Sequence, residues 1–281
     1  MGVCKMKLSD IRHEKTTKLS PLFRLERKLN YKALIFISLI ASVLLFINIA
    51  LFPYMDNILN GLLKYFDGDQ SIKEILEVLG NMSIGTYFSA QAAQVWAFFG
   101  GLYAAGLGCK LINNNFKDGS YELLYTQNAS RTKIVLNKLL RLVINLVIFN
   151  TVCALFGLIA LLIWGNGQFK FINFLGYYLF TIVATIQIGV FSFALALLGK
   201  RKFNIIYAML IVLVFYTFAS LTLSGTLLKL FQCLSPLSVT FSDIVGSGYG
   251  VINYYSFAIW FVVPAVLLYL GIKNYKNSDL I

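Results

Sequence analysis

Residues Leu139–Trp164 read LLRLVINLVIFNTVCALFGLIALLIW, and this stretch decides the fold class. It holds a single charged side chain, Arg141, near its beginning. A helix rises about 1.5 Å per residue, so about 20 apolar residues cross the roughly 30 Å hydrocarbon core of a bilayer. The stretch is therefore long and apolar enough to form a transmembrane helix.

The whole chain repeats this pattern, with 58% hydrophobic and only 13% charged residues among its 281. Backbone polar groups in lipid must be satisfied within the spanning segment, which favours helices here. We therefore predict an all-α integral membrane protein with six transmembrane helices. The six runs are Ala33–Phe52, Ile84–Gly108, Leu139–Trp164, Phe171–Gly199, Asn204–Ser224 and Ile252–Ile272.

Basic residues between the runs indicate the orientation. Twenty of the 24 Lys and Arg residues fall on one side, in the N-terminal arm, the loops after the second and fourth runs, and the tail. Cytoplasmic loops carry the excess of Lys and Arg, so we predict a multi-pass protein of the cell membrane with both termini cytoplasmic. The net charge of +12 then follows from the basic residues on the cytoplasmic side, so it does not indicate a nucleic-acid partner.

The residues before the first run favour an interfacial helix. Leu22, Leu25 and Leu29 recur at helical spacing between Pro21 and Lys32, with basic residues among them. Such a segment can lie on the inner membrane surface, against lipid headgroups, although a plain charged flank remains an alternative. We expect one membrane domain over 1–281: an arm and interfacial helix (1–32), six helices (33–272) and a cytoplasmic tail (273–281).

A stripe of small residues marks the second run. Gly100, Ala104 and Gly108 follow one another at four-residue intervals. Small residues let helix backbones approach closely in lipid, so we predict a helix-packing seam. Asn145, Asn150 and Gln187 also fall inside runs; hydrogen bonding between helices is favoured over substrate contact for them.

The sequence lacks the motifs that several kinds of catalysis and metal binding require. There is no G-x-x-x-x-G-K-[ST] loop for ATP, no H-E-x-x-H and no G-x-S-x-G, so we do not expect an enzyme. The four cysteines and the single histidine, His13, lack metal-ligand spacing, so no metal or cofactor is expected in this chain. Few ionisable residues lie within the runs, which disfavours an ion-driven carrier.

The loop between the second and third runs has an ordered pattern. Asp118, Gly119 and Ser120 form a turn and helix-start signal, and Tyr121 and Leu124 then share one helical face. A short cytoplasmic helix with exposed aromatic and leucine residues suits docking into a groove of a partner protein.

The same loop resembles a known family. Its segments Gly119-Ser-Tyr-Glu-Leu-Leu, Ser130-Arg-Thr-Lys-Ile and Lys138-Leu-Leu are similar to the signature of type 2 permeases of ATP-binding-cassette exporters. The family pattern runs roughly Gly-Thr-x-Glu-x-Leu-Leu, then Pro-x-Ser-Arg, then Gly-Lys-Leu. Two departures are Ala129, beside the usual proline, and Asn113–Asn115, in place of an upstream acidic pair.

This resemblance implies a function. It implies a permease subunit that pairs with a second, identical or related, permease chain and with cytoplasmic ATPase subunits that bind the ATP and Mg²⁺. It also implies that the loop transmits the ATPase cycle to the membrane helices. The candidate coupling residues are Gly119, Tyr121, Glu122, Leu123, Leu124, Arg131 and Lys138. The alternative from another class is a non-transporting sensor or immunity protein that binds a peptide at its first outer loop.

Overall fold

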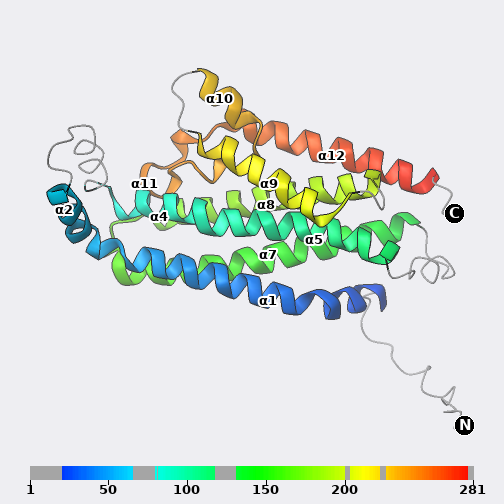
Figure 1. The fold of residues 1–281 in the computed structure, drawn as a ribbon, viewed down its shortest axis with the longest axis horizontal. Coiled ribbons are helices and arrows are strands. Elements are labelled where there is room, and N and C mark those ends of the chain that lie inside the picture. Colours follow the sequence, from blue (N-terminus) through cyan, green and yellow to red (C-terminus); the bar gives the residue numbers. More distant parts are fainter. Residues whose placement is uncertain are drawn as a thin grey trace, which may run out of the picture.

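The computed structural model describes residues 21–65, 80, 82–117, 131–199, 203–221 and 226–277. Every regular element in these ranges is a helix, and five helices are long and apolar enough to cross a membrane. Figure 1 shows the long helices side by side in one elongated bundle. The chain is thus an all-α integral membrane protein, as the sequence predicts.

The spanning helices follow the predicted runs and extend some of them. The span elements are α1 (Pro21–Ala50), α4 (Ile84–Ala92), the π-helix η3 (Ala93–Ala97), α5 (Phe98–Lys117), α7 (Arg131–Trp164), α8 (Phe171–Gly199) and α12 (Tyr254–Asn277). Elements α4, η3 and α5 form one span. The shorter elements are η2 (Phe52–Tyr54), α2 (Met55–Tyr65), α9 (Ile205–Ser220), α10 (Thr226–Cys233), η5 (Pro236–Val239), α11 (Ile244–Ser247) and η6 (Tyr249–Val251).

The helices continue beyond the apolar runs into the basic residues that flank them. α5 runs on to Lys117, and α7 begins at Arg131, about two turns before its apolar run. The long stems of Lys and Arg can lie along apolar surface while their charges reach water or headgroups, so a helix can keep its bonding beyond the hydrocarbon core. The predicted surface segment Pro21–Lys32 is likewise the first part of α1, with no helix boundary before the span.

The fifth predicted run, Asn204–Ser224, is shorter in the structure than expected. The Asn204 side chain accepts a hydrogen bond from the backbone N–H of Ile205, and the helix α9 ends at Ser220, with Leu221 in extended conformation. Sixteen residues of helix span about 24 Å, less than the roughly 30 Å hydrocarbon core. α9 is therefore an apolar helix that falls short of a full crossing by itself.

Short elements complete the bundle beside the end of α9. The 3-10 turn η5 packs against α8 and α9, and α11 packs against α4. Every residue of Pro236–Val239 is buried, and the Ser256 hydroxyl of α12 donates a hydrogen bond of 3.1 Å to the Ser235 carbonyl. Non-helical backbone is tolerated at membrane depth where protein encloses it. This segment meets that condition.

The helix α8 organises the core. It packs against α5 on one side and α12 on another, while α7 packs against α1. Large aromatic side chains fill the interior, including Trp96 and Tyr177, whose ring centroids lie 5.7 Å apart. Figure 1 also shows that the start of α1 and the end of α12 lie at the same end of the bundle.

Candidate functional site

The second span is the most enclosed of the five full spans. The apolar window of the span α4–η3–α5 is 67% buried, against 33% for α1 and 22% for α12. Its Lys117 end leads directly into residues 118–130, the predicted coupling segment. This span is therefore the centre of the candidate site.

The predicted small-residue seam lies where α5 meets its neighbours. A Cβ placed on Gly108 would lie 2.5 Å from the carbonyl oxygen of Gly189 in α8, so the two backbones touch there. A Cβ on Gly100 would lie 3.0 Å from side-chain atoms of both Phe149 and Thr185. Ala104, between them, is fully buried. All three predicted positions thus face neighbouring helices; their importance for assembly stays a prediction.

A chain of polar side chains joins three helices inside the bundle. The indole Nε1 of Trp96 donates a hydrogen bond of 2.8 Å to Asn150 Oδ1 in α7. The Asn150 amide donates in turn to Thr185 Oγ1 in α8, at 2.9 Å, and to the Leu146 carbonyl, at 2.8 Å. Asn150 therefore forms hydrogen bonds with other helices, as the sequence predicts. Sequence reasoning missed Trp96 and Thr185, because nothing local marks either residue as a partner.

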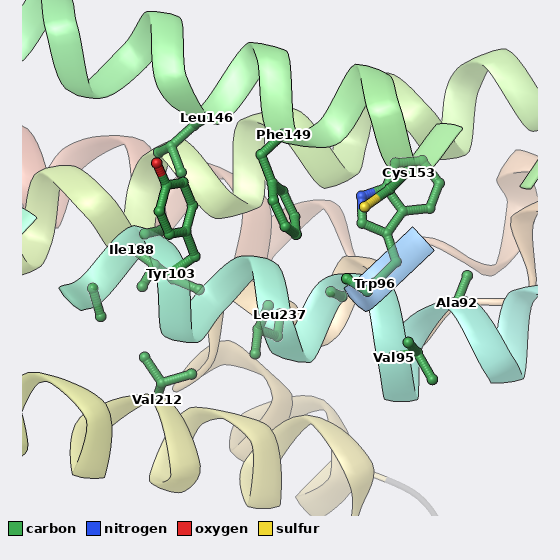
Figure 2. Packing of buried hydrophobic residues seen from close by; sticks show 14 of the residues in the cluster. Ala92, Val95, Trp96, Tyr103, Leu146, Phe149, Cys153, Ile188, Val212 and Leu237 are labelled. Carbon is green, nitrogen blue, oxygen red and sulfur yellow. The ribbon is translucent and has the colours of Figure 1, made fainter. Parts of the chain in front are cut away.

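This polar chain starts in the π-helical turn. Trp96 lies within η3, Ala93–Ala97, where the span departs from α-helical bonding. Single π turns inside α-helices are rare and occur frequently at functional sites. Figure 2 shows Trp96 and Tyr103 on the second span, with Phe149 of α7 reaching toward them. The rings of Tyr103 and Phe149 stack with centroids 5.6 Å apart.

Other buried polar groups have no hydrogen bond among the described residues. Asn145 in α7 is completely buried, and both atoms of its amide lack a partner there. The same holds for the amide of Gln187 in α8 and for the hydroxyl of Tyr103 in α5. Unpartnered polar groups in a low-dielectric interior are costly, so these positions favour a role beyond packing.

The Lys117 end of the second span is tied to two neighbours. Lys138 of α7 is buried, and its Nζ donates a hydrogen bond to the carbonyl of Leu111 in α5. The Asn113 side chain donates to the carbonyl of Phe203, just before α9. A cation near the last turns of α5 also interacts favourably with the helix dipole. The end of α5 and the starts of α7 and α9 are thus linked.

The predicted coupling residues are only partly described. Gly119, Tyr121, Glu122, Leu123 and Leu124 lie outside the described residues. Arg131 is the first residue of α7. Lys138 lies two turns further along α7, where its side chain faces α5.

An apolar groove opens beside the second span. Its volume is about 420 Å³, and it lies between α1, α5 and α9. Tyr103, Gly106 and Lys110 contribute to its α5 wall. A groove of this size lies within the usual range of small-molecule sites.

Comparison with known families decides what kind of membrane protein carries these features. The model of the ABC-2 family transporter proteins matches residues 32–280, which is nearly the whole chain. The chain belongs to the ABC-2 transporter family. A comparison with curated proteins finds no match.

As an ABC-2 transporter, the chain is a membrane permease of an ABC transport system. Permeases of this family generally contribute the membrane part and work with an ATP-binding subunit in the cytoplasm. The family match covers all five full spans and α9, so the enclosed second span and its links to α7, α8 and α9 belong to the ABC-2 permease unit.

Proposed function

We propose that this ABC-2 permease is the membrane subunit of an exporter, passive alone and driven by a separate cytoplasmic ATPase that binds ATP and Mg²⁺. A second permease chain, identical or related, completes the translocation path. The observation that carries the proposal is the link between α5 and α7. These are the two helices that flank residues 118–130, and the Lys138 Nζ to Leu111 carbonyl bond joins them.

The link gives the coupling proposal a mechanical basis. A force applied to the 118–130 segment acts on the end of α5 and the start of α7 together, because Lys138 holds these ends against each other. The Asn113 bond to the Phe203 carbonyl extends the same unit to the start of α9. Closure of the ATPase would then move three helix ends as one body, a rigid two-state transition of the kind that transporters use.

Six crossings with both termini in the cytoplasm agree best with the fold. An odd number of crossings would leave the two ends of the chain on opposite sides of the membrane. The start of α1 and the end of α12 lie at the same end of the bundle, as Figure 1 shows. In addition to the five full spans, we infer a sixth crossing made by α9 together with the enclosed turn η5, which pack against each other. The excess of Lys and Arg assigns that common end to the cytoplasm, with the first turns of α1 as the interfacial helix.

Site-directed labelling tests the orientation. A single cysteine in place of Asn57, in α2, should react with a membrane-impermeant reagent added to intact cells. A single cysteine in place of Lys273, exposed near the end of α12, should react only after permeabilisation. Labelling of position 273 in intact cells would contradict the proposed topology.

Charge reversal tests the coupling. Glu122→Lys should uncouple ATP hydrolysis from export, while the protein still inserts and pairs with its second chain. A buried interfacial charge that loses its mate costs about 2–5 kcal/mol. Gln127→Lys is the matched control, since it adds a cation to the same segment without removing an acid. Photocrosslinkers at Tyr121 or Leu124 should capture the ATPase subunit. Normal export by Glu122→Lys, with crosslinks only to lipid, would instead favour the non-transporting sensor or immunity protein.

A further inference from the structure

The two halves of the second span pack against different parts of the bundle. The half before the π turn, α4, packs mainly against the short helix α11, whereas the half after it, α5, packs mainly against α8 and α9. The π turn η3, Ala93–Ala97, separates the two halves. The change of neighbours therefore falls where α-helical bonding in this span is interrupted.

Side-chain and backbone contacts hold α4 to α11. Asp243, the N-cap of α11, accepts a hydrogen bond of 2.9 Å from the Thr86 hydroxyl, and the Val245 N–H donates one of 3.2 Å to the Ser89 hydroxyl. The two backbones also touch, because a Cβ on Gly85 would lie 2.9 Å from the Val245 carbonyl oxygen. These contacts make α4 and α11 one structural unit, the α4–α11 unit.

Other contacts fix α5 to the rest of the bundle. The Lys138 Nζ of α7 donates a hydrogen bond to the Leu111 carbonyl, and Gly108 lets the Gly189 carbonyl of α8 approach closely. These contacts lie on the far side of η3 from the α4–α11 unit. A bend at η3 would therefore break none of the bonds that hold α5 in place.

The α4–α11 unit is attached less firmly to the long helices beside it. The Phe88 ring meets rings of α8 through aromatic contacts, which can slide without losing a hydrogen bond. The Asn173 amide of α8 reaches the Val245 carbonyl at 3.5 Å, which is longer than usual for an N–H to oxygen bond. The Tyr87 hydroxyl bonds to the Asn48 carbonyl, in the last turn of α1. Most of these links permit a small tilt.

The π turn itself has one exposed residue. Gln94 is exposed, while the other residues of Ala93–Ala97 are buried. A π turn closes i→i+5 hydrogen bonds and so holds more chain than an α turn, and sharp helix kinks occur at such turns. The Trp96 bond to Asn150 anchors the turn to α7, so a bend beside it would pivot about a fixed point.

We propose that η3 is a hinge, at which the α4–α11 unit tilts against α5 as the permease alternates between its two states. The part played in alternation rests on the proposed export function. α4 has nine residues, so a bend of about 20° would move its Ile84 end by about 5 Å. α11 moves with it, which changes the packing at the end of the bundle opposite the termini (Figure 1). Hinge motions of this kind are a common form of conformational switching.

Distances between spin labels in the purified full-length chain test the hinge. Labels at Met82 and Ile206 lie on opposite sides of η3, whereas Leu140 and Ile206 both belong to helices on its α5 side. Labelled chain is diluted with excess unlabelled chain in nanodiscs, so only distances within one chain are recorded. The distribution for Met82–Ile206 should be broader by about 5 Å, the displacement expected from the bend. Equal widths for the two pairs would overturn the proposal.

Deletion of Gln94 is the matching variant. It removes the exposed residue that the π turn accommodates, so the turn becomes α-helical and the buried residues on either side keep their neighbours. The Met82–Ile206 distribution should narrow to the width of the control pair, and export should be lost. Gln94→Ala keeps the number of residues in the turn and should match wild type in both measurements. An unchanged width or normal export after the deletion would overturn the hinge.

The distance measurements need no ATPase, so their outcome is separate from that of the coupling tested by Glu122→Lys. A permease that fails to couple to an ATPase can still show the broad Met82–Ile206 distribution, and one that couples can lack it. If the deletion variant does not fold, the comparison of the two label pairs in the wild-type chain still decides the proposal.

Discussion

Trp96 and Asn150 lie 54 residues apart in sequence, yet the indole of one donates a 2.8 Å hydrogen bond to the amide oxygen of the other. Through Asn150 the bond continues to Thr185, so the second, third and fourth spans share one buried polar chain. Water is absent from the bilayer core, so a partner lost here cannot be replaced by solvent.

Asn150→Leu should therefore destabilise the permease. It leaves the Trp96 N–H without an acceptor and removes two hydrogen bonds made by the Asn150 amide. Bonds between membrane helices are worth about 0.6 kcal/mol on average and up to about 1.7, so we expect a loss of about 1–2 kcal/mol in detergent unfolding. Thr217→Val is the control, because the Thr217 hydroxyl bonds to the Val214 carbonyl of its own helix and to no other residue in the described part of the chain. Equal stability of the two variants would contradict a structural role for the chain.

Two glycines of α5 provide a matched pair. Gly108→Ala should push α5 away from α8, because the new methyl group would meet the Gly189 carbonyl oxygen at 2.5 Å. Overpacking of this kind costs about 1–3 kcal/mol. Gly106→Ala faces only Met209 Cε at an ordinary 3.5 Å and should be neutral or gain about 0.5–1 kcal/mol from helix propensity. Thermal unfolding of both variants in the same detergent measures the difference; a Gly108→Ala protein as stable as Gly106→Ala would refute the seam.

Lys138→Met tests whether the tie between α5 and α7 transmits force. Methionine keeps much of the length of the buried side chain and removes the charged donor to the Leu111 carbonyl. The free energy of unfolding should fall by about 1.5–3 kcal/mol, the contribution of a hydrogen bond from a charged group, so export is compared at equal amounts of folded protein. Export per ATP hydrolysed should fall as well, because α5 and α7 are no longer tied. The exposed Lys133 of the same helix is the control, as Lys133→Met. Unchanged export in Lys138→Met would mean that the tie does not transmit force.

An acid at the other end of the bundle ties α11 to α4. Asp243 caps α11 by accepting from the Gly246 N–H at 2.9 Å, and it accepts from the Thr86 hydroxyl at 2.9 Å. Thr86→Val should loosen α11 on α4, while the hydrogen bond from the Val245 N–H to the Ser89 hydroxyl remains. A loss of about 1 kcal/mol corresponds to about fivefold faster hydrogen exchange in Ile244–Ser247. Thr86→Ser keeps the hydroxyl and should exchange like wild type; rapid exchange in both variants would point to another cause.

Apolar runs and basic flanks predicted most of the fold, because lipid restricts a spanning chain to long helices. Five of the six runs are helices of sufficient length. The early end of α9 was not foreseen: the residues after Ser220, Leu221-Thr-Leu-Ser-Gly225, read as apolar in a hydropathy window although Ser and Gly favour turns.

The candidate site was less predictable than the spans. The four-residue spacing of Gly100, Ala104 and Gly108 identified a packing stripe, but not α8 as the helix that touches it at Gly108. The sequence indicates that Asn150 forms a hydrogen bond with another helix. It does not identify Trp96 as the partner, because that depends on which helices pack together. Lys138 matched a loop signature, yet tertiary packing turns it toward Leu111. Contacts between distant segments leave no local mark in a single sequence.

The π turn at Ala93–Ala97 has a consequence for helical phase. Positions four apart drift around an α-helix by about 40° per step, so from Phe88 to Gly108 the drift would reach about 200°. One extra residue accommodated in a π turn takes back about 100° of that drift. The residues at this spacing are Phe88, Ala92, Trp96, Gly100, Ala104 and Gly108, and all six are buried. The π turn thus reduces the rotation between the two parts of this span. As a result Phe88 and Trp96 before Gly100, and the small residues from Gly100 onward, face the same interior of the bundle. Deleting a single residue from the turn would return it to α-helical bonding and leave the two halves in phase, whereas inserting one would rotate one half by about 100° and expose part of this row to lipid.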